Sequence, residues 1–205
     1  MKIAVKKAMR GSTRAYNEFL RHVLPEQGCW TEEKYLWLTD HARRLAEFTD
    51  GFIEVLPMPT DRHQSVLGFL YTLFTAFIEP LGGKVHFSGL RLKVREGKIR
   101  EPDLLLVKNR KDPRRQDRFW LGADLTLEVV SKDNPRRDLV DKRHDYAEGG
   151  VPEYWIVNPL KETIIIYRLH GKRYKKRGEF GRGEVATSAT LEGFSVKVDE
   201  VFDAD

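Results

Sequence analysis

Apolar positions that recur every three or four residues predict a long amphipathic helix from Thr60 to Ile78. Thr60 or Asp61 is the expected N-cap, because its side chain can accept from a backbone N–H of the first turn. Pro80 and the glycines that follow it are expected to end the helix. The apolar stripe consists of Val66, Leu67, Leu70, Leu73, Phe74, Phe77 and Ile78.

Further along the chain, short apolar runs predict a series of strands. Apolar residues alternate with other residues over Lys84–Val94, which predicts one strand with an irregularity at Gly89. Glu96-Gly97-Lys98 is expected to turn the chain back. The next strands are expected at Ile99–Val107, Ala123–Val130 and Glu153–Val157. A short helix, Asp138–Glu148, lies between the last two and ends at Gly149-Gly150.

The two ends of the chain add smaller elements. Thr13–Leu24 is expected to be a helix, a second helix begins at the N-cap Thr31, and Asp50-Gly51 is a hairpin signal joining Leu45–Thr49 to Phe52–Leu56. Toward the C-terminus we expect a hairpin of Thr163–Leu169 with Lys172–Phe180, and strands at Val185–Leu191 and Phe194–Val198. The order predicts an α/β fold with a mixed sheet, as a 31–205 domain after a 1–30 extension.

Composition narrows the class of protein. The 205 residues carry 36 Lys and Arg against 31 Asp and Glu, a net charge of +5 that is compatible with a polyanionic partner. No apolar run reaches the length of a membrane span, and the basic N-terminus lacks the apolar segment of a signal peptide. The single cysteine, Cys29, excludes an internal disulfide framework. We therefore expect a cytoplasmic protein without membrane association.

Two carboxylates stand within or beside the buried runs. Glu128 shares a strand face with Thr126 and Val130, and Asp103 follows Pro102 just before the apolar Leu104. If the two strands pair, the acids approach closely, so that one pKa rises or a cation bridges them. Oxygen ligands of this kind suit Mg²⁺ or Mn²⁺. The simpler alternatives are a salt bridge from Glu128 to an arginine and a turn-forming role for Asp103.

A lysine is predicted to join these acids. Lys142 lies at the edge of the apolar stripe of the helix Asp138–Glu148, where its ammonium can turn toward the sheet while Asp138 pairs with it one turn away. An ammonium beside two carboxylates is suited to activating water or to stabilising charge on a phosphoryl group. The alternative is a surface lysine that lays its stem along the helix.

Basic residues flank both acids in the sequence. Arg110, Lys111, Arg114, Arg115 and Arg118 crowd into the loop 109–118, and Lys132 begins a second group after Glu128. We expect the loop to contact phosphate, although a charged loop can also be merely solvated.

These residues resemble a known signature. Pro102-Asp103 followed by Glu128-Val129-Val130 resembles the PD-(D/E)XK nuclease superfamily. The longer stretch of sequence that contains Glu128, Asp138, Lys142 and Tyr146 and ends with residues 150–157 resembles the Uma family of this superfamily. The resemblance covers about Thr31 to Phe202.

The resemblance implies a restriction endonuclease-like core of a helix, a three-strand meander, a crossover helix and a fourth strand, with additional strands at both ends. It implies a divalent cation held by Asp103 and Glu128 with the Val129 carbonyl. The lysine that usually stands two residues after the glutamate is replaced by Val130, so the family's lysine maps onto Lys142, with Lys132 as competitor. Glu54 and His63 match accessory positions, although Glu54 also fits an ordinary hairpin acid and His63 an N-terminal helix residue.

Two functions follow as hypotheses. The first is a Mg²⁺-dependent endonuclease acting on DNA, with Asp103, Glu128 and Lys142 as the catalytic residues. The second, motivated by Val130 at the usual lysine position, is an inactive nuclease-like module for nucleic-acid binding or assembly. A homodimer through the C-terminal hairpin is compatible with either function.

Overall fold

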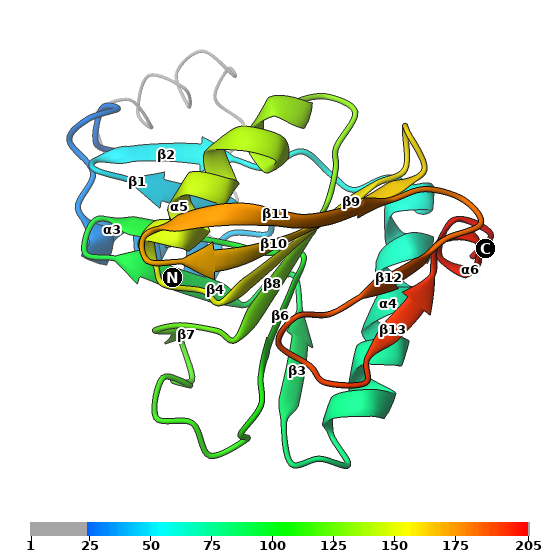
Figure 1. Cartoon of the computed structure of the whole chain (residues 1–205). Helices are drawn as coiled ribbons and strands as arrows, with labels where there is room; N and C mark the ends of the chain where they lie inside the picture. The colour runs from blue at the N-terminus through cyan, green and yellow to red at the C-terminus, as the bar shows by residue number, and fades with distance from the viewer. Residues whose placement is uncertain (1–23, 205) are drawn as a thin grey trace, which may run out of the picture.

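The computed structural model describes residues 24–204, and its elements form two mixed sheets, a small third sheet and four α-helices (Figure 1). The predicted helix Thr13–Leu24, apart from its last residue, and most of the extension 1–30 lie outside the described residues. The six-stranded sheet has the order β11-β10-β9-β8-β6-β3, and the five-stranded sheet the order β2-β1-β5-β4-β7. Within residues 24–204, no helix is both long enough and apolar enough to cross a bilayer.

The six-stranded sheet holds the main core between two helical layers. Its strands are β3 (Lys84–Phe87), β6 (Leu104–Val107), β8 (Leu125–Val129), β9 (Glu153–Asn158), β10 (Thr163–His170) and β11 (Arg173–Phe180). Neighbouring strands are antiparallel except β8 and β9, which are parallel and therefore need a crossover connection. The crossover is the π-helical turn η1 (Arg137–Asp141) followed by α5 (Lys142–Glu148).

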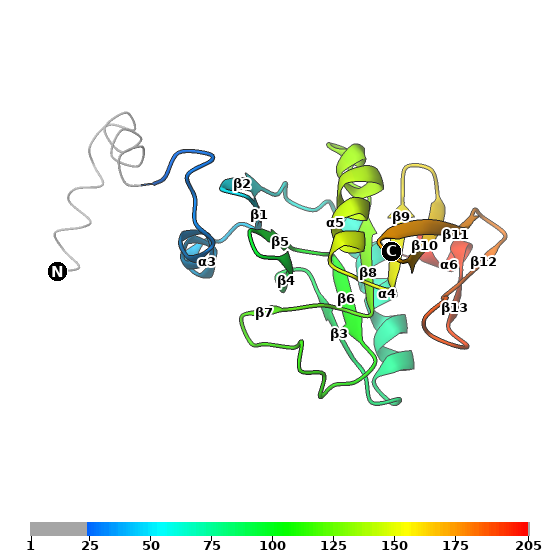
Figure 2. The same ribbon diagram turned by 60° about the vertical axis from the view of Figure 1, so that its left-hand side comes forward.

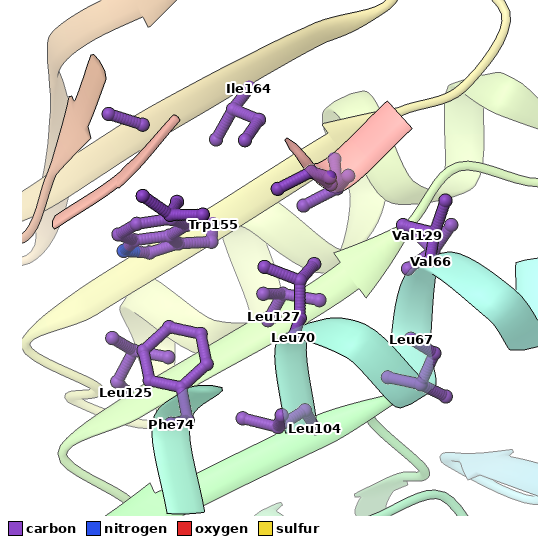
Figure 3. Packing of buried hydrophobic residues seen from close by; sticks show 14 of the residues in the cluster. Val66, Leu67, Leu70, Phe74, Leu104, Leu125, Leu127, Val129, Trp155 and Ile164 are labelled. Atoms are coloured by element: carbon purple, nitrogen blue, oxygen red, sulfur yellow. The ribbon is translucent and has the colours of Figure 1, made fainter. Parts of the chain in front are cut away.

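Opposite faces of this sheet bury different clusters. One face packs against α4 (Asp61–Ile78), and Figure 3 shows Leu125, Leu127 and Trp155 of the sheet against Leu70 and Phe74 of the helix. The small sheet of β12 (Val185–Thr187) and β13 (Ser195–Lys197) and the helix α6 (Val198–Phe202) close this cluster. The other face packs against α5, so that α4 and α5 lie on opposite sides of β8 (Figure 2).

The five-stranded sheet is built from the N-terminal hairpin and the middle of the chain. Its strands are β1 (Ala46–Thr49), β2 (Phe52–Val55), β4 (Arg91–Arg95), β5 (Lys98–Arg100) and β7 (Phe119–Trp120). The helix α3 (Glu32–His41) covers one face through Tyr35 and Leu36, which pack on Phe48 and Ile99. The other face of β1 and β5 is turned toward α5, as the ion pairs between these elements require.

Two predicted strands are wrong, each in the same way. Lys84–Val94 is not one strand with an irregularity, because a turn with Gly89 at φ +103° sends β3 and β4 into different sheets. Ile99–Val107 likewise divides into β5 and β6, separated by Glu101-Pro102-Asp103. Proline has no N–H to donate to a ladder, so the chain leaves one sheet there and enters the other.

The remaining elements agree more closely with the sequence. Thr31 and Thr60 cap α3 and α4 as predicted, since each hydroxyl accepts from the backbone N–H three residues on. Asp50 and Gly51 both have positive φ, the geometry of a tight hairpin turn. The strands β12 and β13 are shorter than predicted, and α6 replaces the end of the second.

The aromatic contacts of Phe74 make it the sharpest test of the main core. Its ring stacks on Phe194 at 4.3 Å between centroids and meets Trp155 edge-on at 5.5 Å. We expect Phe74→Ala to lower the free energy of unfolding in urea by about 3–5 kcal/mol, since it removes a fully buried ring and leaves a cavity. Phe87→Ala, at a position that is 54% exposed, should cost less than about 1 kcal/mol; equal losses would contradict this assignment of the core.

Candidate active site

The register of β6 and β8 sets the two predicted acids opposite each other. Leu104 pairs with Leu127, and one further step of the same antiparallel register places Asp103 opposite Glu128. Directly opposite residues have Cβ atoms roughly 5 Å apart on one face. The Oδ2 of Asp103 also accepts from the Val129 N–H at 2.8 Å, which fixes the carboxylate at the end of β8. The face is the one that Glu128 shares with Thr126 and Val130, as the alternation predicted.

Glu128 is buried with both carboxylate oxygens occupied. Its Oε2 accepts from Lys142 Nζ at 2.6 Å, and its Oε1 accepts from the Tyr146 hydroxyl. Burial raises the pKa of Glu128 well above its usual value; the Lys142 ammonium opposes the rise, and the charges of Asp103, Asp138 and Glu47 reinforce it. The two hydrogen bonds therefore hold Glu128 in one rotamer.

Lys142 reaches the acids because η1 and α5 present it to the sheet. The π turn brings Asp138 and Lys142 onto the buried side, with Lys142 Nζ 3.7 Å from Asp138 Oδ1. The predicted competitor, Lys132, is exposed in the segment after β8. The structure thus brings Lys142 onto Glu128, while its role in catalysis stays a prediction.

Glu47 on β1 is a further acid of the cluster that the sequence reading missed. Its Oε1 lies 3.5 Å from Lys142 Nζ, and its Oε2 accepts from Arg137 at 2.6 Å. Burial alone would raise the pKa of Glu47, but the charges of Lys142, Arg137 and Arg100 lower it to about 2. The alternation of Ala46 and Phe48 with Glu47 looks like an ordinary half-exposed strand, and no local signal distinguishes it.

The accessory positions lie around the same cluster. His63, in the first turn of α4, has its Nε2 3.2 Å from Asp103 Oδ1. Burial lowers the pKa of His63, but the hydrogen bond and the charge of Asp103 outweigh it and leave the pKa raised. Glu54 on β2 is exposed and bonds Arg137 at 3.0 Å, so it joins the cluster only through that arginine. Asp138 accepts from the Ser131 N–H and lies beside Lys142.

The basic loop 109–118 is not beside the acids. Asp103 precedes β6 and the loop follows it, so the two lie at opposite ends of that strand, with the start of the loop six positions or roughly 20 Å from Asp103. Arg114 is tied to Asp112 and Asp124, and therefore braces the loop. Arg110, Lys111 and Arg115 have no carboxylate partner within residues 24–204, and they line a hollow of about 570 Å³ beside Trp120.

Comparison with known proteins identifies the family and a similar fold. Residues 32–199 match the family model described as "Uma2: Putative restriction endonuclease". The chain belongs to the Uma2 family. Its structure is similar to that of a putative nuclease belonging to DUF820 from Anabaena variabilis, with a TM-score of 0.66 at 18% identity over 91% of this chain and 96% of that one. None of the curated proteins compared with it matches significantly.

Within residues 24–204, no three His, Cys, Asp or Glu side chains are grouped in an arrangement that could by itself hold a metal ion. The acids of this Uma2 chain are instead interleaved with Lys142 and Arg137. A cation at Asp103 and Glu128 would therefore need a change of partner at Glu128, whose two oxygens are both in use.

The buried carboxyl of Glu101, next to the site, allows the electrostatics of this region to be tested without any ligand. Its side chain is buried, its Oε2 has no hydrogen-bond partner among the described residues, and Arg91 Nε stands 3.8 Å from its Oε1. Burial raises its pKa from 4.5 to about 7, and the charge of Glu47 adds to the rise. Between pH 4.5 and about pH 7, the folded chain therefore keeps a proton on Glu101 that the unfolded chain has released.

It follows that the free energy of unfolding loses a contribution from Glu101 as pH rises from 4.5 to 7. We expect Glu101→Gln to match the wild type near pH 4.5 and to exceed its stability by up to roughly 3 kcal/mol above pH 7. Urea denaturation at several pH values measures this difference. Glu33→Gln, on the exposed side of α3, is the control for loss of one charge, and a pH-independent gain in Glu101→Gln would contradict the expectation.

Proposed function

We propose that this chain is a divalent-metal-dependent endonuclease that hydrolyses phosphodiester bonds in DNA. The observation that carries the proposal is the buried Lys142 ammonium on Glu128, with Asp103 opposite that glutamate. A buried charged group at the mouth of two strands contributes little to stability, so a chemical role accounts for it better than a structural one. Membership of the Uma2 family supports the same reading.

The order of elements supports a restriction endonuclease-like core. Helix α4 is followed by the antiparallel strands β3, β6 and β8, then by the crossover α5 and the parallel strand β9. This is the order that the resemblance implies, apart from the excursion of β4 and β5 into the second sheet between β3 and β6.

The donor set fits Mg²⁺ or Mn²⁺. The carboxylates of Asp103 and Glu128 with the Val129 carbonyl would be oxygen ligands, which these cations prefer. Four carboxylates of the cluster share three permanent cations, and two of these cations also pair with other acids, Arg137 with Glu54 and Arg100 with Asp145. This excess of carboxylates also favours a bound cation; the groups are Glu47, Asp103, Glu128 and Asp138 against Lys142, Arg137 and Arg100. The fit requires Glu128 to exchange Lys142 or Tyr146 for the cation.

Each side chain of the site then has a definite task. A divalent cation, when bound, supplies Lewis-acid activation of water and of the phosphoryl oxygen. Lys142 presents an ammonium that orients the attacking water or stabilises charge on the phosphate. Tyr146 holds Glu128 in its rotamer through the bond to Oε1, and His63 orients Asp103 through Oδ1.

Loss of either acid should abolish cleavage. With plasmid DNA and Mg²⁺ or Mn²⁺, we expect Asp103→Asn and Glu128→Gln to lower the nicking rate by at least about a hundredfold, because each removes an oxygen ligand of charge −1. Lys161→Ala, at an exposed position in the loop before β10, is the control for folding and purity. Equal cleavage by wild type and Glu128→Gln would show that the activity comes from a contaminating nuclease, and would contradict the proposal.

The basic loop 109–118 is proposed as a second contact to the phosphate backbone. It lies about six base pairs from the acids if roughly 20 Å is divided by the rise of a base pair. Removing Arg110, Lys111 and Arg115 together should weaken DNA binding and lower the salt slope by up to about 3, while cleavage at saturating DNA stays unchanged. Fluorescence anisotropy across a salt series measures this. The control removes equal charge from the β10–β11 hairpin, as Lys172→Ala, Arg173→Ala and Lys175→Ala; equal effects of both triple variants would indicate non-specific attraction.

One observation favours a second candidate, an inactive module that binds nucleic acid. Both oxygens of Glu128 are already in use, so the site is complete without a cation. This candidate predicts salt-dependent binding without turnover in the same experiments. A homodimer also stays a prediction, and the exposed cations along the edge strand β11 would oppose pairing of two such edges.

A further inference from the structure

We propose that Glu47 is the positioning residue of Lys142: it takes the ammonium when Glu128 turns to a divalent cation. The inference rests on the proposed function, because it concerns what the site does when such a cation binds. It assigns a role to an acid that lies on another sheet, 81 positions from Glu128 in the sequence.

The need for a second acceptor follows from burial. Lys142 is 4% exposed and its shortest ion pair is the 2.6 Å contact to Glu128 Oε2. If Glu128 gives that oxygen to a cation, the ammonium loses its closest partner while the lysine side chain stays buried in the protein. A buried charge that loses its partner costs several kcal/mol, so cation binding at Glu128 is favourable only where another acceptor is ready.

Glu47 is placed to be that acceptor. Its Oε1 stands 3.5 Å from Lys142 Nζ, so a movement of well under 1 Å makes a full hydrogen bond. The carboxylate is itself immobile, since Arg137 donates to Oε2 at 2.6 Å and the Glu101 N–H donates to Oε1 at 3.1 Å. Arg100 adds a third cation at 3.5 Å, so that Glu47 remains an anion.

Asp138 is the competing acceptor, at 3.7 Å from Lys142 Nζ. It stands one turn before Lys142 in the same helical segment, and its other carboxylate oxygen accepts from the Ser131 N–H. Glu47 belongs to β1, and its contacts fix it relative to the sheet that carries the N-terminal hairpin. The geometry therefore favours Glu47 as the group that sets where the ammonium points.

The test measures cation affinity rather than cleavage. By calorimetry with MnCl₂ on the full chain, Glu47→Gln should bind Mn²⁺ on the order of tenfold more weakly than wild type, because Lys142 then competes for Glu128. Glu148→Gln is the matched control: it removes a carboxylate that joins α5 to the five-stranded sheet through Arg95 and Lys98 without touching Lys142, and should leave the affinity unchanged. In a Lys142→Met background, Glu47→Gln should have no effect, since no ammonium remains to be held.

A crystal structure of the wild type soaked with Mn²⁺ provides a readout that does not depend on the folding of any variant. We expect Lys142 Nζ within hydrogen-bonding distance of Glu47 and released from Glu128. A lysine that stays on Glu128 or turns to Asp138, or a Glu47→Gln affinity equal to wild type, overturns this inference alone. Absence of Mn²⁺ binding by the wild type overturns it together with the proposed metal dependence.

Discussion

The ion pair of Lys142 with Glu128 is the interaction around which the site is built. It joins a strand buried on both faces to the helix that crosses over it, and neither group has access to water. Such a pair is tolerated only if every remaining donor and acceptor is matched. Tyr146 satisfies the second oxygen of Glu128, and Glu47 stands close to the ammonium, so the pair requires two different elements to be in place.

This requirement explains why the two sheets meet where they do. At this meeting point the five-stranded sheet makes a series of ion pairs with η1 and α5: Arg100 with Asp145, Lys98 with Asp145 and Glu148, Arg95 with Glu148, and Glu47 with Arg137. Each sheet also has an apolar cluster against its own helix, and a third apolar cluster joins Leu92 of β4 and Trp120 of β7 to Tyr146 of α5. Charged contacts depend on direction more than apolar ones do, so they fix the position of Glu47 relative to Lys142 more tightly than a smooth apolar seam would.

The sequence predicts the parts of the site that are local and fails where the chain changes sheets. Period-2 alternation around Glu128 and the stripe of α5 were enough to place the glutamate and Lys142 on facing surfaces, because each pattern reports one face of one element. No pattern could reveal that β3 and β4 belong to different sheets, since both halves of that run alternate equally well. Glu47 was missed for the same reason, because its partners come from elements brought together only by the fold.

The basic loop shows that residues close in the sequence can lie far apart in space. Arg110 and its neighbours stand seven or more positions after Asp103, yet a strand of four residues carries them to the other end of the sheet. A strand covers about 3.3 Å per residue, so a short separation along an extended chain is a long one in space. By contrast Lys142, 14 positions from Glu128, returns to it because the crossover helix folds back over the strand it has just left. Separation in space therefore follows the elements between two residues rather than their number. For this reason Asp103 and Glu128 lie beside Lys142, on a helix that follows them in the sequence, and beside Glu47, on a strand that precedes both.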